Sequence, residues 1–337
     1  MTNKSPLKVV IAGAGSIGCY VGGMLAAGGG NVHFFARQRI ADDLLQNGLQ
    51  LTDLTGKNNT LSPNQFNVSL NQDVLKDADL ILICVKSKDT LEMAKTIKLS
   101  GNTHATIFSL QNGISNTAEI KSVLPSHTVL TVMVPYNVVY QVGGKFHCGT
   151  EGSLYCQNSE QAKPLKTLAD NAGLGFELKD DMASILWGKL LLNLNNPINA
   201  LSGIPLKQQL ESATFRKVLR KSMLEGMAVL KAAGITPAQV AAVPMRVIPV
   251  ILSLPNWLFK RVAQKMLAMD PKARSSMWED LQNKRPVEVD YINGEIVKLG
   301  KQLNVNTPMN ERLIKLVKEA QDRGLGSPNM APGNILN

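Results

Sequence analysis

The stretch VVIAGAGSIG, residues 9–18, decides the fold. Its apolar start is typical of a buried strand, and three glycines follow at the spacing Gly13-x-Gly15-x-x-Gly18. The first glycine permits a tight turn, the second lets the backbone approach a phosphate, and the third lets the next helix pack against the strand. The helix N-terminus then offers amide donors to a pyrophosphate. We therefore expect a dinucleotide-binding turn, with contacts from Gly13, Ala14, Gly15, Ser16, Ile17 and Gly18.

Apolar runs and helical stretches alternate from this turn to about residue 179. This alternation is typical of a mostly parallel sheet with helices between its strands. The expected strands are 8–13, 31–36, 80–85, 105–110 and 128–134, with 146–149, 152–157 and 176–179 as further strands that extend the same sheet.

Strand signals disappear after Asp180 and Asp181, two acidic residues that favour a helix start. Proline-rich punctuation between 237 and 271 indicates a looser connection or an insertion, and the last residues have the composition of a tail. We expect an α/β fold: an N-terminal Rossmann-type, mostly parallel sheet over residues 1–179, an all-helical C-terminal domain over 180–323, and a flexible tail over 324–337.

The bulk composition narrows the class of protein. The 337 residues are 44% hydrophobic and 18% charged, which suits a soluble chain with two cores. The net charge of +10 comes from scattered lysines and arginines, so it favours small anions over nucleic acid. The four cysteines form no CxxC pair or Cys/His cluster, which predicts reduced thiols, a cytoplasmic protein and no metal site. The apolar stretch 9–30 is too rich in glycine to predict a membrane span.

Arg37 indicates which dinucleotide binds. An NAD site would place an acidic residue at the end of the second strand, about 20 residues after the glycines, to hold the ribose hydroxyls. Here that position carries Arg37, with Arg39 close by. A guanidinium pairs bidentately with phosphate, so the expected cofactor is NADPH/NADP. The alternative is an ordinary surface arginine.

Two further candidates follow the third and fourth strands. Lys86 lies in CVKSKDT and Asn112 in SLQNGISN, both at carboxyl strand ends, where open α/β sheets bind ligands. Lys86 is a candidate cofactor contact, and its alternative is a solvated lysine. The alternative for Asn112 is that it only stabilises the turn between Gln111 and Gly113.

The stretch WGKLLLNLNNPINALSG, residues 187–203, places a polar stripe on a leucine-rich helix. At about 100° per residue, Lys189, Asn193 and Asn196 lie within roughly 60° of one another. These polar side chains face either a ligand or, in a protein core, neighbouring groups that satisfy their hydrogen bonds. Pro197 should kink or end the helix near Asn193.

The block SSMWEDLQNKRPVEVDYINGEI, residues 275–296, contains Ser276 and Glu288. The alternative is that these residues only cap a helix or interact favourably with its dipole, without a role in catalysis or binding.

Taken together, these blocks resemble the ketopantoate reductase family over nearly the whole chain. GAGSIG, VKS, QNG, KLLLN, SSM and EVDYING occur in the family's order, and Ser276 and Glu288 stand 12 residues apart as in the family. The resemblance implies NADPH-dependent reduction of 2-dehydropantoate to (R)-pantoate, in the route to pantothenate and coenzyme A. It implies Lys189 as the catalytic residue, substrate contacts at Asn112, Asn193, Asn196, Ser276 and Glu288, and cofactor contacts at Arg37, Lys86 and Asn112.

Two departures leave details open. The family's second asparagine follows the first by four residues and precedes a proline, whereas Asn196 follows Asn193 by three, so Asn195 and Asn199 compete for that role. The region from Lys189 to Glu288 is longer than in compact members, with 240–272 as the extra part. It could reshape the substrate pocket or form the interface of a homodimer.

Lys189 would stabilise and protonate the oxygen of a ketone that receives a hydride. Three alternatives remain: a same-fold reductase of another branched 2-keto acid, a non-catalytic NADP-binding regulator, and a methyltransferase that binds S-adenosylmethionine at the glycine loop. The expected partner is a small 2-keto acid, not nucleic acid or a membrane.

Overall fold

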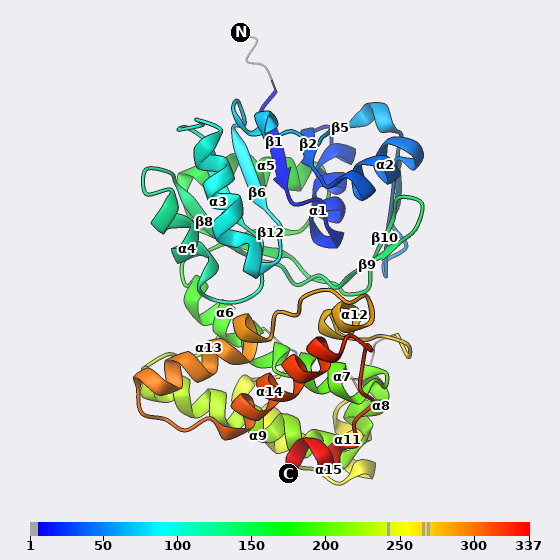
Figure 1. Ribbon diagram of the computed structural model, residues 1–337, viewed down its shortest axis with the longest axis vertical. Coiled ribbons are helices and arrows are strands. Elements are labelled where there is room, and N and C mark those ends of the chain that lie inside the picture. The colour runs from blue at the N-terminus through cyan, green and yellow to red at the C-terminus, as the bar shows by residue number, and fades with distance from the viewer. Residues whose placement is uncertain (1–5, 241–242, 265–266, 268–269) are drawn as a thin grey trace. The chain divides into compact units, whose positions relative to one another are not determined.

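The computed structural model describes residues 6–240, 243–264, 267 and 270–337 (Figure 1). The chain divides into two compact units, Met1–Met182 and Ala183–Asn337. We call them the sheet unit and the helical unit, and describe each by itself.

The main sheet of the sheet unit has eight strands in the order β12-β11-β8-β7-β6-β1-β2-β5. Every neighbouring pair is parallel except β8 and β11. The expected α/β fold with a mostly parallel sheet is therefore confirmed. The strands are β1 (Lys8–Ala12), β2 (Asn31–Phe35), β5 (Asn67–Ser69), β6 (Leu80–Ile83), β7 (Thr106–Ser109), β8 (Val129–Met133), β11 (Leu154–Gln157) and β12 (Phe176–Lys179).

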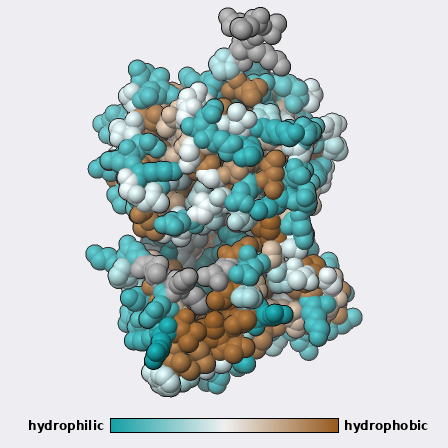
Figure 2. Space-filling view, turned by 180° about the vertical axis from the view of Figure 1, so that it is seen from behind, coloured by the Kyte–Doolittle hydropathy of each residue, from teal (hydrophilic) through white to brown (hydrophobic). Residues whose placement is uncertain are grey.

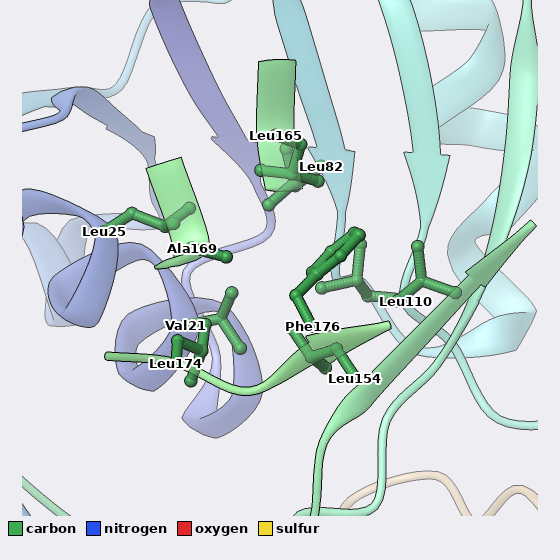
Figure 3. A pocket seen from close by; sticks show the side chains of 10 residues that line it. Val21, Leu25, Leu82, Leu110, Leu154, Leu165, Ala169, Leu174 and Phe176 are labelled. Atoms are coloured by element: carbon green, nitrogen blue, oxygen red, sulfur yellow. The ribbon is translucent and has the colours of Figure 1, made fainter. Parts of the chain in front are cut away.

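The central strands are apolar on both faces because each face is covered by helices. Val9 and Ile11 of β1 join one core with side chains of α1 and α5, and Val10 and Ala12 join another with side chains of α3 and α4. Figure 3 shows part of the first core, where the labelled side chains are all hydrocarbon. The helices are α1 (Ser16–Ala27), α2 (Gln38–Asn47), α3 (Thr90–Leu99), α4 (Asn116–Val123) and α5 (Lys163–Asn171), with short 3-10 turns η1 (Pro63–Gln65), η2 (Gln72–Leu75), η3 (Ser87–Asp89) and η4 (Glu160–Ala162).

A second, four-stranded sheet was not expected. Its order is β4-β3-β10-β9, in which β10 is parallel to β3 and the other pairs are antiparallel. The segment 146–149 was predicted to extend the main sheet, and that prediction is wrong: β10 pairs with β3 and β9 instead. Segments 152–157 and 176–179 do extend the main sheet. The strands of this second sheet are β3 (Leu49–Asp53), β4 (Asn58–Leu61), β9 (Val138–Gln141) and β10 (Lys145–Cys148).

Helix α1 packs closely against both sheets. A Cβ on Gly22 would lie 2.6 Å from Ile11 Cγ1 in the main sheet. A Cβ on Gly23 would lie 2.8 Å from Leu51 Cδ1 in the second sheet. Real Cβ atoms do not approach other atoms this closely, so two adjacent glycines allow the helix to lie between two layers. This explains why Gly22 and Gly23 lie within the helix, beyond the turn itself.

The described residues of 183–337 form helices and no strand. Helix α9 packs between α6 and α13, because a Cβ on Gly226 would lie 2.7 Å from Leu191 Cδ2 and 3.3 Å from Ile296 Cδ1. No helix in the described ranges is long and apolar enough to cross a membrane. The helices are α6 (Met182–Asn193), α7 (Asn196–Ser202), α8 (Leu206–Glu211), α9 (Ala213–Ala232), α10 (Ile248–Leu252), α11 (Asn256–Val262), α12 (Ser276–Gln282), α13 (Val289–Gln302), α14 (Pro308–Arg323) and α15 (Pro332–Leu336), with the 3-10 turn η5 (Met245–Val247).

The expected insertion 240–272 contains η5, α10 and α11, while residues 241, 242, 265, 266, 268 and 269 lie outside the described residues. Arg216 of α9 anchors it. This fully buried guanidinium donates to the carbonyl oxygens of Leu252 and Leu254 at 3.2 and 2.7 Å, and lies 4.1 Å from the centre of the Phe259 ring. Val250 and Trp257 of these helices are exposed, and Figure 2 shows apolar side chains gathered on part of the helical unit.

The C-terminal segment 324–337 was predicted to be a flexible tail, and the structure corrects this. Ile335 of α15 is fully buried, and Arg312 Nε donates to its carbonyl oxygen at 2.7 Å. Met330 N donates to Leu201 O at 2.7 Å. The glycines and prolines that suggest a loose tail instead shape a segment whose apolar side chain packs on the helical unit.

Candidate active site

The glycine turn before α1 has the geometry of a phosphate-binding loop. Gly13 has φ +108°, and a Cβ there would lie 2.7 Å from Val85 N. A Cβ on Gly18 would collide with the Gly13 carbonyl oxygen, so the missing side chain lets α1 start close to β1. A Cβ on Gly15 would meet no heavy atom within 4 Å, and no side chain caps the first turn of α1. The open space and the backbone amides of that turn fit a phosphate group.

Arg37 is the N-cap residue of α2, just after β2. Its side chain is 90% exposed, and its Nη2 lies 3.5 Å from Asp89 Oδ2. Arg39 lies over the Tyr140 ring, 5.4 Å from the guanidinium carbon to the ring centre. Both arginine side chains are exposed, and Arg39 is the one that lies over an aromatic ring.

Lys86 and Asn112 lie beyond the carboxyl ends of two neighbouring parallel strands, β6 and β7. Lys86 is the residue before η3, and Asn112 lies in the loop before α4. Because such strand ends meet at one edge of a sheet, the sheet unit places both residues at the edge where open α/β sheets bind ligands.

A buried polar network fixes the backbone of Asn112. Its carbonyl oxygen accepts from Ser87 Oγ at 3.0 Å and from Asn116 Nδ2 at 2.6 Å. Gln111 Nε2 donates to Thr90 Oγ1 at 2.6 Å, and Thr90 Oγ1 donates to Asn116 Oδ1 at 2.7 Å. These four residues were not singled out from the sequence, where the usable signal is the amide side chain of Gln111 directly before Asn112.

In the helical unit, Lys189 and Glu288 interact electrostatically. Lys189 is half-buried on α6, and Glu288 is buried just before α13. Burial lowers the pKa of Lys189 to about 8, and the Glu288 carboxylate partly opposes this by favouring the charged ammonium. The side chain of Glu288 makes no capping bond to α13, so helix capping does not account for it.

The helix that carries Lys189 ends as predicted: α6 stops at Asn193 and α7 begins at Asn196, around Pro197. Among the described residues, the half-buried side chains of Asn193 and Asn196 make no hydrogen bond that would occupy them. Both are thus available to a ligand.

The competing asparagines have structural roles. Asn199 is fully buried, donates to Gln209 Oε1 at 3.0 Å and accepts from Ser275 N at 2.9 Å. Gln209 Nε2 in turn donates to Asn195 Oδ1 at 2.5 Å. Of the three candidates for the second asparagine, Asn196 is therefore the one that this network leaves unused.

Ser275 rather than Ser276 performs the capping at the start of α12. Ser275 Oγ accepts from Trp278 N at 3.2 Å and donates to Asn196 O at 3.2 Å. Ser276, the next residue, is half-buried and begins the helix. The cap and Asn199 together join α12 to α7 and thereby fix the backbone next to Ser276.

Among the described residues, no group of three or more His, Cys, Asp or Glu side chains could hold a metal ion. The four cysteines are free thiols. Burial raises the pKa of Cys84 to about 12, so this thiol is a poor nucleophile.

The parallel sheet with its glycine loop, followed by a helical unit with a half-buried lysine and a buried carboxylate, defines a class of proteins that bind a nucleotide cofactor. Two family models match: "Ketopantoate reductase PanE/ApbA" over residues 9–161 and "Ketopantoate reductase PanE/ApbA C terminal" over residues 181–321. The chain therefore belongs to the ketopantoate reductase family.

Individual relatives agree with this assignment. The 2-dehydropantoate 2-reductases of Halobacterium salinarum and Archaeoglobus fulgidus are 26% and 27% identical, covering 94% and 92% of this chain and 100% and 97% of their own. A PanE/ApbA family ketopantoate reductase from Ralstonia eutropha is 29% identical, with a TM-score of 0.81 over 94% of this chain and 99% of that one. D-mandelate dehydrogenase, solved with NADH, shares the fold at 21% identity and a TM-score of 0.76, over 94% of this chain and 99% of its own.

Proposed function

We propose that this protein reduces 2-dehydropantoate (ketopantoate) to (R)-pantoate with NADPH, a step in the route to pantothenate and coenzyme A. Family membership and the names of its relatives support the reaction. The observation that carries the proposal is the interaction of Lys189 with Glu288, because a regulator without catalysis has no need of a half-buried ammonium with a pKa of about 8 beside a buried carboxylate.

The sheet unit would hold the cofactor. The turn from Gly13 to Gly18 would bind the pyrophosphate, and Arg37 the 2′-phosphate. Lys86 and Asn112 would make further contacts at the sheet edge. When bound, NADPH supplies the hydride.

Lys189 would act on the oxygen of the ketone. The ammonium stabilises the negative charge that develops there and then donates its proton to the oxygen, which completes the alcohol. A pKa of about 8 suits this role, since the group is mostly protonated at neutral pH yet gives up a proton more readily than a solvated lysine.

The remaining polar groups of the helical unit would orient the substrate. Glu288 can accept a hydrogen bond from the substrate hydroxyl, and Ser276 can donate one to its carboxylate. Asn193 and Asn196 offer amides that can both donate and accept. These roles follow from the family resemblance and from the chemistry of the groups.

The test is an NADPH-oxidation assay with ketopantoate beside a panel of other 2-keto acids. A kcat/KM for ketopantoate at least tenfold above those of the others supports the proposal. A higher value for a different branched 2-keto acid would retain the reaction class and change the substrate. NADPH binding without turnover on any of these acids would instead indicate a regulator.

A further inference from the structure

Asp89 places a carboxylate beside the arginine proposed to select the cofactor. Asp89 Oδ2 lies 3.5 Å from Arg37 Nη2, although the two residues belong to different loops of the sheet unit. An NAD site uses an acidic residue near the end of the second strand, the position of Arg37 here, to hold the ribose hydroxyls. Here it comes from the segment after β6 rather than from the end of β2, which is why the spacing rule for the second strand does not find it.

The backbone and a neighbouring lysine hold Asp89 in place. Its amide donates to Lys86 O at 2.8 Å at the end of η3, and Lys88 Nζ lies 3.3 Å from Asp89 Oδ1. Only 21% of the Asp89 side chain is exposed, against 90% for Arg37. The carboxylate is thus the more constrained partner, and the arginine is the one with room to turn toward a ligand.

We propose that Asp89 is a second cofactor-selecting residue that opposes Arg37, so that this protein uses both NADPH and NADH with a modest preference. This inference rests on the proposed function of the sheet unit. The carboxylate accepts a hydrogen bond from the 2′-hydroxyl of NADH and repels the 2′-phosphate of NADPH. Arg37 has the opposite effect, because its guanidinium attracts the 2′-phosphate of NADPH.

The weakness of the ion pair allows both cofactors to bind. At 3.5 Å the contact is long for a hydrogen bond, and exposed ion pairs contribute little. A 2′-phosphate can therefore take the guanidinium away from Asp89, and Lys88 then partly neutralises the carboxylate left beside it. Without a phosphate, Arg37 stays with Asp89 and the carboxylate keeps a free lone pair for the ribose.

The experiment measures dissociation constants of NADPH, NADH, 2′,5′-ADP and 5′-AMP for the wild type, Asp89→Asn and Asp89→Ala. Loss of the negative charge should tighten NADPH and 2′,5′-ADP by about 3- to 5-fold in both variants. Asp89→Ala also removes the ribose acceptor, so it should weaken NADH and 5′-AMP more than Asp89→Asn does. Asp42→Asn, which removes the same charge on α2 where Asp42 contacts Gln38, is the control and should leave all four constants unchanged.

The side chain of Asp89 does not cap α3, so both variants should keep the fold, which circular dichroism checks. An unchanged ratio of NADPH to NADH affinity in both variants would overturn the role of Asp89. Wild-type protein that binds none of the four ligands would overturn the proposed function instead. Because 2′,5′-ADP and 5′-AMP carry no nicotinamide, their dissociation constants test the ribose site without any contribution from turnover.

Discussion

Lys189 and Glu288, far apart in the sequence, act on one another inside the helical unit. Lys189 lies on α6 and Glu288 directly precedes α13. Burial alone would make the lysine neutral at a lower pH, and the carboxylate counters that effect, so the pKa of Lys189 remains at about 8. The pair thus supplies a proton donor that is charged at neutral pH although it is largely removed from water.

Replacing Lys189 with alanine should lower kcat for ketone reduction by about 10²- to 10⁴-fold, because the variant lacks the group that protonates the oxygen. The affinity for NADPH should hardly change, since that ligand is assigned to the sheet unit. Stopped-flow and steady-state assays measure the first quantity, and fluorescence titration the second. Lys298→Ala, which removes the same charge from the exposed side of α13, serves as the control. Turnover at the wild-type rate in Lys189→Ala would refute the assigned role.

The pH dependence of kcat should follow the same lysine. A general acid must be protonated, so the rate of reduction should be level at neutral pH and fall as pH rises through about 8. Glu288→Gln removes the charge that raises the pKa of Lys189, so the fall should move to lower pH. Asp290→Asn is the matched control, because Asp290 pairs with Lys318 at 2.8 Å and is exposed. A profile that does not move in Glu288→Gln would mean that another group titrates.

Seven of the eight strands of the main sheet could be predicted because they carry their own signal, whereas β5, with only three residues, was missed. In β1 and β6 both faces are apolar, which only a strand covered on two sides requires. The second sheet could not be predicted in the same way, since β3 and β4 are short and partly polar. For β10 the pattern identified a strand but not its partner, which depends on where α1 lies between the layers.

The same contrast holds for the candidate residues. Pro197 acts locally, so the end of α6 could be read from the sequence. The separate roles of Asn196 and Asn199 could not, because they depend on α8 and α12 packing against α7. Asp89 escaped notice for a related reason: its contact with Arg37 joins loops after two different strands.

Arg37→Asp should reverse the cofactor preference. The new carboxylate would repel the 2′-phosphate and accept from the ribose hydroxyl, so the ratio of kcat/KM for NADPH to that for NADH should fall by at least about tenfold. Initial rates with each cofactor at saturating ketopantoate give the ratio. Lys95→Asp, the same charge reversal on the exposed side of α3, should not change it. If both variants lower the ratio equally, the effect is one of general charge and not of a phosphate contact.

Asn199→Ala should raise the KM for the keto acid and also lower stability. Asn199 is the acceptor for Ser275 N, and its loss leaves that buried donor unpaired, at a cost of about 1–3 kcal/mol in the free energy of unfolding. The backbone beside Ser276 and Asn196 should then be less well fixed. Ser202→Ala is the control, because Ser202 is buried on the same helix and donates only to Asn199 O at 3.2 Å. Destabilisation with an unchanged KM would limit Asn199 to a structural role.

Arg216→Met should loosen the segment of η5, α10 and α11 without abolishing the helical unit. Removal of the guanidinium leaves buried carbonyl oxygens, including those of Leu252 and Leu254, without donors, at a cost of about 3 kcal/mol or more. Hydrogen exchange should therefore become faster in residues 245–262 than in α13. Arg220→Met is the matched control on the same helix, since Arg220 makes one such bond, to Pro249 O at 3.1 Å, and its loss should have a smaller effect. Methionine fills much of the volume of the lost side chain, so the substitution mainly removes hydrogen bonds. Faster exchange in Arg216→Met alone would attribute the stability of this segment to those hydrogen bonds. Equal exchange in the two variants would attribute it to apolar packing.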